Sequence, residues 1–409
     1  MLRILLLMPS FYGLVFFGTN YVLYLANDGE YEDIALATHL VCVLVTLVFG
    51  LATLRSYPAC ARLAPELADR GFKRLELHPA FILLLHAIGL AGIAQYFRSL
   101  VAHFGSPLEV GLRLMSSSAD IRIAADDLTD VGIGTQLSYF GWIAIWVTAV
   151  SERRGHVRWL LMVMSVIQIL ANLLYIDRTR PIWILFVWGL LVAIRHFRSL
   201  QTRRLLALAA GAVVGVVVVF VGAGAWIGKV DVSEVGNSAN GLATAFQPLY
   251  IYLTSGFAFL NRMLLVDQPD FTLARSLYPV GTLVSHLGLV EPPPSQINEF
   301  LWTPLPTNVG TFLEPLYRDG GIALMVLGTL MHSFGFNWLG RLLIHNRAPL
   351  CLLAWAMLCF TDAIAFFTPK YTNTPTWLVL GLGVFVLLRA RASGAESRQL
   401  KPRLVAKSG

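Results

Sequence analysis

Two arginines in a short polar segment are the first residues whose types and spacing could do chemistry. Arg178 and Arg180 stand just before Pro181, between two long apolar runs. Because proline is favoured at the first position of a helix, we expect the second run to begin here. A helix N-terminus offers free N–H groups, and guanidinium groups bind phosphate through paired hydrogen bonds. The segment therefore predicts a phosphate or pyrophosphate site, with contact to lipid headgroups as the alternative.

A second set of polar residues precedes a later apolar run. Asn308 and Thr311 belong to the sequence Asn-Val-Gly-Thr, and Arg318 and Asp319 stand directly before the run. Asp319 is expected to cap the helix that follows, and Arg318 adds a cation at the same end. Glu314 is the nearest other carboxylate. It could act as a general base toward an acceptor hydroxyl, or it could be a solvated loop acid.

Other ionisable residues lie inside apolar runs or in the longest polar segment. Arg98 either reaches the lipid headgroups or contributes to substrate binding. Asp362 is too deep in its run to reach water and should pair with a cation, either Arg98 or Lys370. In the long segment, His286 is a candidate general base and Arg275 a candidate substrate-binding residue.

The composition is that of a membrane protein. Of 409 residues, 56% are hydrophobic and only 13% are charged, with a mean hydropathy of +0.66, whereas a soluble domain carries roughly 25% charged residues. The net charge of +7 is spread in short clusters between apolar runs, which is typical of loops at a membrane surface and not of nucleic-acid binding. Ten runs are long enough to cross the ~30 Å of hydrocarbon: 2–26, 34–54, 79–103, 131–150, 158–176, 181–197, 204–227, 320–340, 350–368 and 375–389.

The distribution of basic residues orients these runs. With a cytoplasmic N-terminus and an apolar stretch at 242–265 that does not cross, 21 Lys and Arg residues face the cytoplasm and 9 lie outside. The sequence therefore predicts an all-α polytopic membrane protein with about ten transmembrane helices and both termini inside. Residues 1–227 form spans one to seven and 320–389 the last three. Residues 228–319 form a large outer loop with 242–265 as a re-entrant or interfacial segment, and 390–409 form a basic cytoplasmic tail.

Two stretches of the C-terminal half resemble the Wzy-type O-antigen polymerases, which join oligosaccharide repeat units. One is Asn-Val-Gly-Thr at 308–311, followed after seven residues by Asp319 and then Gly321. The other is Tyr250–Gly256, which looks like the start of the family's large periplasmic loop. The resemblance extends over about residues 170–345, and the first half of the chain matches only in hydropathy.

The resemblance implies glycosyl transfer at the periplasmic face of a bacterial inner membrane. A chain carried on polyprenyl pyrophosphate would move to the terminal sugar hydroxyl of the next lipid-linked repeat. The expected partners are this polyprenyl-pyrophosphate-linked oligosaccharide, membrane lipid and a chain-length regulator protein, and no nucleic acid. One departure concerns Gly320, where the family more often has an aromatic residue, and it leaves the geometry at Asp319 open.

No cofactor or metal is expected, because arginines at a helix N-terminus can stabilise a pyrophosphate leaving group and no outer group of Asp, Glu and His has ligand spacing. Two other functions remain open. An O-antigen ligase would use the same donor with a lipid A–core acceptor. A transporter or flippase would account for Asp362 and Arg98 in the apolar runs.

If Arg178 and Arg180 hold the donor pyrophosphate, Arg180→Ala should abolish polymerisation while the protein still inserts. Loss of such a contact to a developing anion costs about 2.7–4 kcal/mol, or a hundred- to a thousand-fold in rate. Arg180→Lys should also fail, because lysine keeps the charge but not the bidentate fork. Polymer length on gels, normalised to membrane protein level, is the measurement. Wild-type ladders from Ala and Lys variants at both positions would exclude the role and leave Arg275 and Arg318 as the candidates.

Overall fold

The structure, a computed structural model, describes most of the chain as helix. The described residues are 2–26, 31–116, 121, 124, 131–151, 155–175, 179–197, 241–295, 298–299, 301–303, 306–388 and 391–393. The predicted span at 204–227 and most of the predicted tail at 390–409 lie outside them.

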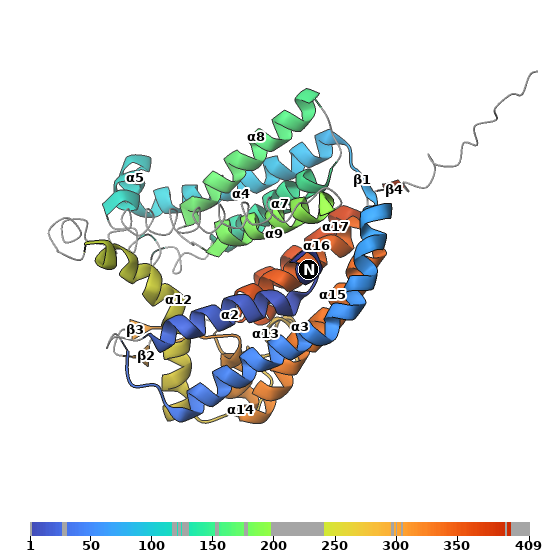
Figure 1. The fold of residues 1–409 in the computed structure, drawn as a ribbon. Coiled ribbons are helices and arrows are strands. Elements are labelled where there is room, and N and C mark those ends of the chain that lie inside the picture. The colour runs from blue at the N-terminus through green and yellow to red at the C-terminus, as the bar shows by residue number, and fades with distance from the viewer. Residues whose placement is uncertain are drawn as a thin grey trace, which may run out of the picture.

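Two groups of long helices lie side by side, as Figure 1 shows. The first group consists of α4 (Pro79–Phe104), α7 (Val131–Val150), α8 (Gly155–Ala171) and α9 (Thr179–Arg195). The second consists of α1 (Leu2–Leu5), α2 (Pro9–Leu25), α3 (Leu36–Arg70), α12 (Gly241–Val266), α14 (Leu313–Leu330) and α15 (Phe336–Asn346). The last two helices are α16 (Pro349–Ala363) and α17 (Thr374–Leu388). They join the groups, because α16 packs against both α2 and α9 while α17 packs against α7.

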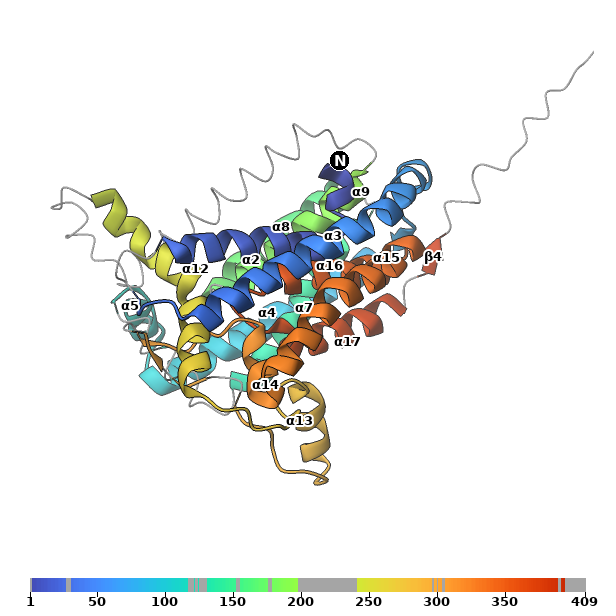
Figure 2. The same ribbon diagram turned by 60° about the horizontal axis from the view of Figure 1, so that its bottom comes forward.

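Several short helices, turns and strands lie at the ends of the bundle. These are α5 (Pro107–Ser116), α13 (Tyr278–His286), two 3₁₀ turns (Asn172–Tyr175 and Lys370–Thr372) and two antiparallel strand pairs. β1 (Arg74–Glu76) pairs with β4 (Arg391–Ser393), and β2 (Leu301–Trp302) pairs with β3 (Pro306–Thr307). In Figure 2, α13 projects below the start of α14.

The helices present apolar side chains outward as well as inward. Among the described residues, five helices are long and apolar enough to cross a membrane: Leu36–Asp69, Pro79–Phe104, Gly155–Tyr175, Leu249–Val266 and Leu313–Asn346. Large side chains such as Leu54 and Leu84 remain exposed on them. A helix satisfies its own backbone hydrogen bonds and can therefore carry such a surface into hydrocarbon. The chain is an all-α, polytopic membrane protein.

Glycines bring α4 and α7 into close contact. A Cβ atom on Gly89 would lie 2.6 Å from the Cα of Gly141, and one on Gly92 would lie 2.6 Å from the carbonyl oxygen of Gly134. Small residues let two helix backbones approach where lipid supplies no hydrophobic driving force between helices. The first group is thus held by contacts that no larger residue would permit.

The segment at 242–265 forms the single helix α12, and its polar residues have partners in the segment before α3. The amide oxygen of Asn261 accepts hydrogen bonds from Ala35 N–H at 2.9 Å and the Thr38 hydroxyl at 2.8 Å, which caps α3. Arg262 pairs with Glu32 at 3.3 Å. Because α12 is long and apolar enough to cross, its predicted re-entrant or interfacial position stays a prediction.

Several predicted boundaries shift. Helix α3 continues to Arg70, well beyond the expected end of the second span at residue 54. The chain is helical from Leu313 to Asn346, where a span over 320–340 is predicted. This helix is kinked at Gly320 and Gly321 and contains a π-helical turn at Met331–Gly335. In the predicted tail, 391–393 forms β4.

The predicted topology can be tested by labelling single cysteines from outside in a cysteine-free variant. Asn240→Cys and Glu299→Cys should both react, because α12 is predicted to enter and leave on the outer side. Lys73→Cys, on the predicted cytoplasmic side, should react only after the membrane is permeabilised. Reaction at one of the first two positions without the other would show that α12 crosses the membrane.

Candidate active site

Glu314 stands in the first turn of α14 and is buried, with 4% of its surface exposed. The turn before it is fixed by Thr311, whose hydroxyl accepts a hydrogen bond from Leu313 N–H at 3.3 Å and whose carbonyl accepts one from Glu314 N–H at 3.1 Å. The N–H of Phe312 donates to the carbonyl of Ala365 at 2.8 Å. The 308–311 motif therefore ends in a turn that places Glu314 at a defined point inside the bundle.

Arg318 lies one helical turn after Glu314 and binds two carboxylates. Its Nε is 3.3 Å from Glu314 Oε1, and its Nη2 is 3.0 Å from Asp267 Oδ2. Its guanidinium carbon also lies 5.7 Å from the ring centroid of Phe259 on α12. Since Asp267 directly follows α12, Arg318 connects the end of that helix to the start of α14.

Arg275 approaches Glu314 from the loop after α12. The two residues line one small pocket of about 20 Å³, together with Tyr278, Pro294, Ser295, Asn298, Pro315, Pro369 and Thr372. Arg275 is close enough to act on the Glu314 charge, and Asn298 is within hydrogen-bonding reach of the carboxylate. A space of this size holds about one water molecule, so the site is closed in this conformation.

Asp319 does not cap α14, and that prediction was wrong. Its carboxylate instead accepts hydrogen bonds from the backbone N–H groups of Arg275, at 3.2 Å, and Ser276, at 2.6 Å. The reason is the break in α14 at Gly320 and Gly321, which separates Asp319 from the helix that it would cap. Asp319 thus holds the backbone of the loop that carries Arg275.

Glycines allow the close approaches around this cluster. Gly321 has a φ of 61°, which favours glycine. A Cβ on Gly310 would lie 2.9 Å from the Glu314 Cβ. A Cβ on Gly256, at the end of the other family-like motif, would overlap the carbonyl oxygen of Phe366. The two motifs therefore meet around the segment that follows α16.

Tyr371 closes the cluster from the 3₁₀ turn before α17. Its hydroxyl donates a hydrogen bond to the carbonyl of Phe312 at 3.2 Å. Burial raises the pKa of the Tyr371 hydroxyl well above its usual value, and the carboxylates of Glu314 and Asp319 add to this effect. The hydroxyl is therefore protonated throughout the physiological range and serves as a hydrogen-bond donor.

Sequence reasoning missed Asp267, Asn298 and Tyr371. Only Asp267 had a local signal, because it is the first acidic residue after the apolar stretch 242–265 and so marks the same end of the bundle as Arg318. Asn298 and Tyr371 reach the site through the tertiary fold alone.

Arg180 lies at the start of α9, as predicted, and is surrounded by aromatic rings. Its guanidinium carbon is 4.1 Å from the ring centroid of Tyr175, 5.6 Å from that of Tyr139 and 6.0 Å from that of Trp142. Stacking of this kind fixes the plane of the guanidinium group. Arg178 lies outside the described residues.

The remaining predicted site residues lie apart from Glu314 or bury their side chains. His286 is exposed at the far end of α13 from Tyr278, and Arg98 is exposed on α4. Neither has a hydrogen-bonding or ionic partner among the described residues. Asn308 is half-buried, and Thr311 is fully buried and shapes the turn.

The buried carboxylate of Asp362 pairs with His332 and not with Arg98 or Lys370, so that prediction was wrong. The His332 Nδ1 lies 3.1 Å from Asp362 Oδ1, and both side chains are buried. The π-helical turn places His332 toward α16, where Phe312 and Tyr371 flank the imidazole ring. Lys370 instead lies 5.5 Å from the ring centroid of Trp183.

Within the described part of the chain, no group of three or more His, Cys, Asp and Glu side chains is placed to hold a metal. Comparison of the chain with known protein families, with curated proteins and with solved structures finds no match. The resemblance to the Wzy-type polymerases therefore stays a prediction based on sequence motifs.

Gly256→Ala tests whether the meeting of α12 with the segment after α16 depends on the absence of a side chain. The added methyl should destabilise the purified protein by about 1–3 kcal/mol, the usual cost of overpacking, and lower its melting temperature in detergent. Gly189→Ala on α9 is the matched control, because a Cβ there meets nothing within 4 Å. Equal melting temperatures for both variants would contradict the close contact.

Proposed function

We propose that the protein is a glycosyltransferase that polymerises polyprenyl-pyrophosphate-linked oligosaccharide repeats at the periplasmic face of a bacterial inner membrane. The observation that carries the proposal is the cluster of buried Glu314 with half-buried Arg318 and Arg275 at one end of apolar helices. A carboxylate to accept a proton and a guanidinium group to bind a phosphate, both in one pocket, are what transfer from a pyrophosphate donor to a hydroxyl requires.

In this reaction the acceptor hydroxyl oxygen forms a bond to the anomeric carbon of the donor sugar, and the bond from that carbon to the pyrophosphate oxygen breaks. Glu314 takes the proton of the hydroxyl. The electron pair of the broken bond stays on the pyrophosphate oxygen, and polyprenyl pyrophosphate is the leaving group. Arg275 stabilises the negative charge that develops on this group. Arg318 is a positioning residue, because Asp267 and Glu314 already engage its guanidinium group.

The small size of the pocket means that substrate binding has to widen it. Pro294, Ser295 and Asn298 form one wall and belong to no helix or strand. Movement of this wall would expose Arg275 and Glu314 without breaking α14. Arg180, which its aromatic neighbours hold at the start of α9, is a second candidate ligand for the pyrophosphate.

A proton-coupled transporter is the second candidate function, and the buried pair of His332 and Asp362 favours it. An ionisable pair inside apolar helices is a common part of a proton pathway. His332 is on the π-helical turn that follows α14, and Asp362 is on α16. A transport role would need this pair, whereas glycosyl transfer would need Glu314 and Arg275.

Purified protein in liposomes, supplied with a labelled chain on polyprenyl pyrophosphate and an unlabelled lipid-linked repeat, tests the proposal directly. Glu314→Gln should lower the rate of chain transfer by about 10²–10⁴-fold, as for loss of a general base. Arg275→Ala should lower it by about 10²–10³-fold. Glu291→Gln, at an exposed acid of the same loop, should match wild type.

Normal transfer by both Glu314→Gln and Arg275→Ala would exclude this site. Transfer of the label only to an added lipid A–core acceptor would identify a ligase instead. Movement of the lipid-linked repeat across the liposome membrane without any new glycosidic bond would identify a transporter.

A further inference from the structure

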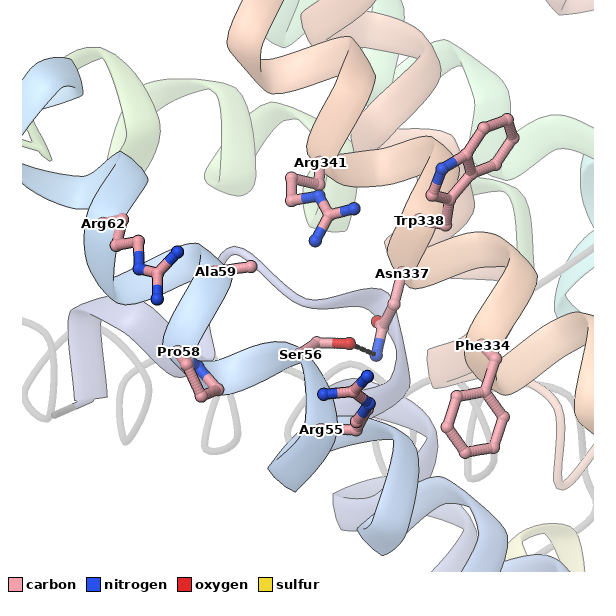
Figure 3. A pocket seen from close by; sticks show the side chains of 9 residues that line it. All are labelled: Arg55, Ser56, Pro58, Ala59, Arg62, Phe334, Asn337, Trp338 and Arg341. Atoms are coloured by element: carbon pink, nitrogen blue, oxygen red, sulfur yellow. Dashed lines mark hydrogen bonds between the residues drawn. The ribbon is translucent and has the colours of Figure 1, made fainter.

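A second pocket lies away from the candidate active site, between α3 and the junction of the π-helical turn with α15. It has a volume of about 370 Å³ and is lined by Arg55, Ser56, Pro58, Ala59, Arg62, Phe334, Asn337, Trp338 and Arg341. Figure 3 shows these side chains around the hydrogen bond between Ser56 and Asn337. The volume is within the range of about 300–1,000 Å³ that is usual for small-molecule sites.

The charge of the pocket is entirely positive. Arg55 and Arg62 are seven residues apart on α3 and so lie on one face of the helix, while Arg341 comes from α15. None of the three has a carboxylate within ion-pair distance in the described structure, and no acidic residue lines the pocket. Three guanidinium groups that share one pocket without a counter-ion favour an anion with several acceptor oxygens, and phosphate has this form.

The floor of the pocket is held by hydrogen bonds of Asn337. Asn337 is buried, and its amide nitrogen donates to the hydroxyls of Ser10, at 2.6 Å, and Ser56, at 2.9 Å, and to the carbonyl of Ala52, at 3.1 Å. Its amide oxygen accepts from Ser10 N–H at 3.0 Å. These bonds join α2, α3 and α15 directly beneath the arginines, so the geometry of the site exists before a ligand binds.

One wall of the pocket is apolar and continues onto the outer surface. Phe334 and Trp338 are four residues apart on one face of the helix and remain 37% and 59% exposed. Exposed Leu342 extends the same face. Tryptophan beside basic residues is typical of the boundary between headgroups and hydrocarbon. A ligand with a phosphate for the arginines and an acyl chain for this wall would fill both parts.

The pocket lies at the other end of the helix from Glu314. Arg341 follows Arg318 by 23 residues, which corresponds to about 35 Å of regular helix at 1.5 Å per residue. This length is comparable to the ~30 Å thickness of the hydrocarbon layer. The pocket is therefore near the headgroups of the leaflet opposite the candidate active site, which the charge distribution predicts to be cytoplasmic and which is rich in anionic lipid.

We propose that this pocket binds the phosphate headgroup of an anionic phospholipid, with one acyl chain along Phe334 and Trp338. The inference is independent of the proposed glycosyl transfer. The lipid would bridge α3 and α15 and neutralise three arginines that otherwise repel one another.

Binding can be measured by native mass spectrometry of the purified full-length protein titrated with phosphatidylglycerol, with phosphatidylcholine as the zwitterionic comparison. Wild-type protein should retain phosphatidylglycerol preferentially. The double variant R55Q/R341Q should bind it at least about tenfold more weakly, because it loses two charge-assisted contacts to the phosphate. Arg158→Gln, at an exposed arginine of α8, should bind as wild type does. Arg55→Gln with Arg62→Gln is a second double variant in which both changed residues are exposed, so that misfolding cannot explain the loss.

Two further measurements separate a lipid from a free anion. Inorganic phosphate at the same concentration should not displace the lipid, and Trp338→Ala should weaken lipid binding. Equal binding of phosphatidylglycerol by wild type and both double variants would overturn the site. Efficient displacement by inorganic phosphate, or lipid binding unchanged in Trp338→Ala, would overturn the lipid as its ligand.

Discussion

The ion pair between Glu314 and Arg318 organises the end of the bundle that holds the candidate active site. Moving an ion out of water costs several kcal/mol unless a partner compensates it, and Glu314 is almost completely buried. Arg318 compensates Glu314 and also binds Asp267 at the end of α12. The same pair therefore holds together two helices and the loop between them. Removing Arg318 would leave buried Glu314 with Arg275 as its only other nearby arginine among the described residues, whereas removing Glu314 would leave Arg318 paired with Asp267.

Buried amides connect helices that are distant in sequence. Asn261 on α12 caps α3, and Asn337 on α15 binds backbone or hydroxyl groups of α2 and α3. In an environment where lipid competes equally for apolar side chains, such polar contacts specify which faces of two helices meet. Both amides lie against α3, so Asn261 fixes this long helix at its start and Asn337 fixes it near its middle.

The sequence predicts the helices well because hydrocarbon leaves the backbone almost no other choice. It predicts the site only in part. Glu314 and Arg318 are four residues apart, so their contact follows from helical spacing. No local pattern predicts that Arg275 lies near Glu314, because Arg275 is 39 residues earlier in the chain and is brought there by a loop. The sequence likewise does not predict the aromatic rings around Arg180, because Tyr139 and Trp142 come from a different helix.

The two wrong predictions have a common physical cause. The expected cap at Asp319 assumed a regular helix after it, and the expected partner of Asp362 was sought among lysine and arginine. The structure has a glycine break after Asp319 and a π-helical turn that directs His332 to Asp362. Irregular helical turns change the direction of side chains without changing hydropathy, so composition and periodicity do not reveal them.

The kink at Gly320 and Gly321 and the π-helical turn at Met331–Gly335 also constrain how this stretch can evolve. One residue added to or removed from a helix rotates everything beyond it by about 100°. Between Glu314 and Arg341, an insertion or deletion would turn one end of the helix away from its neighbours while the other stayed in place. Substitutions on the lipid-facing side do not change the rotation of one end of the helix relative to the other. Divergence here should therefore proceed by exchange of side chains at constant length, and length changes should concentrate in the loops.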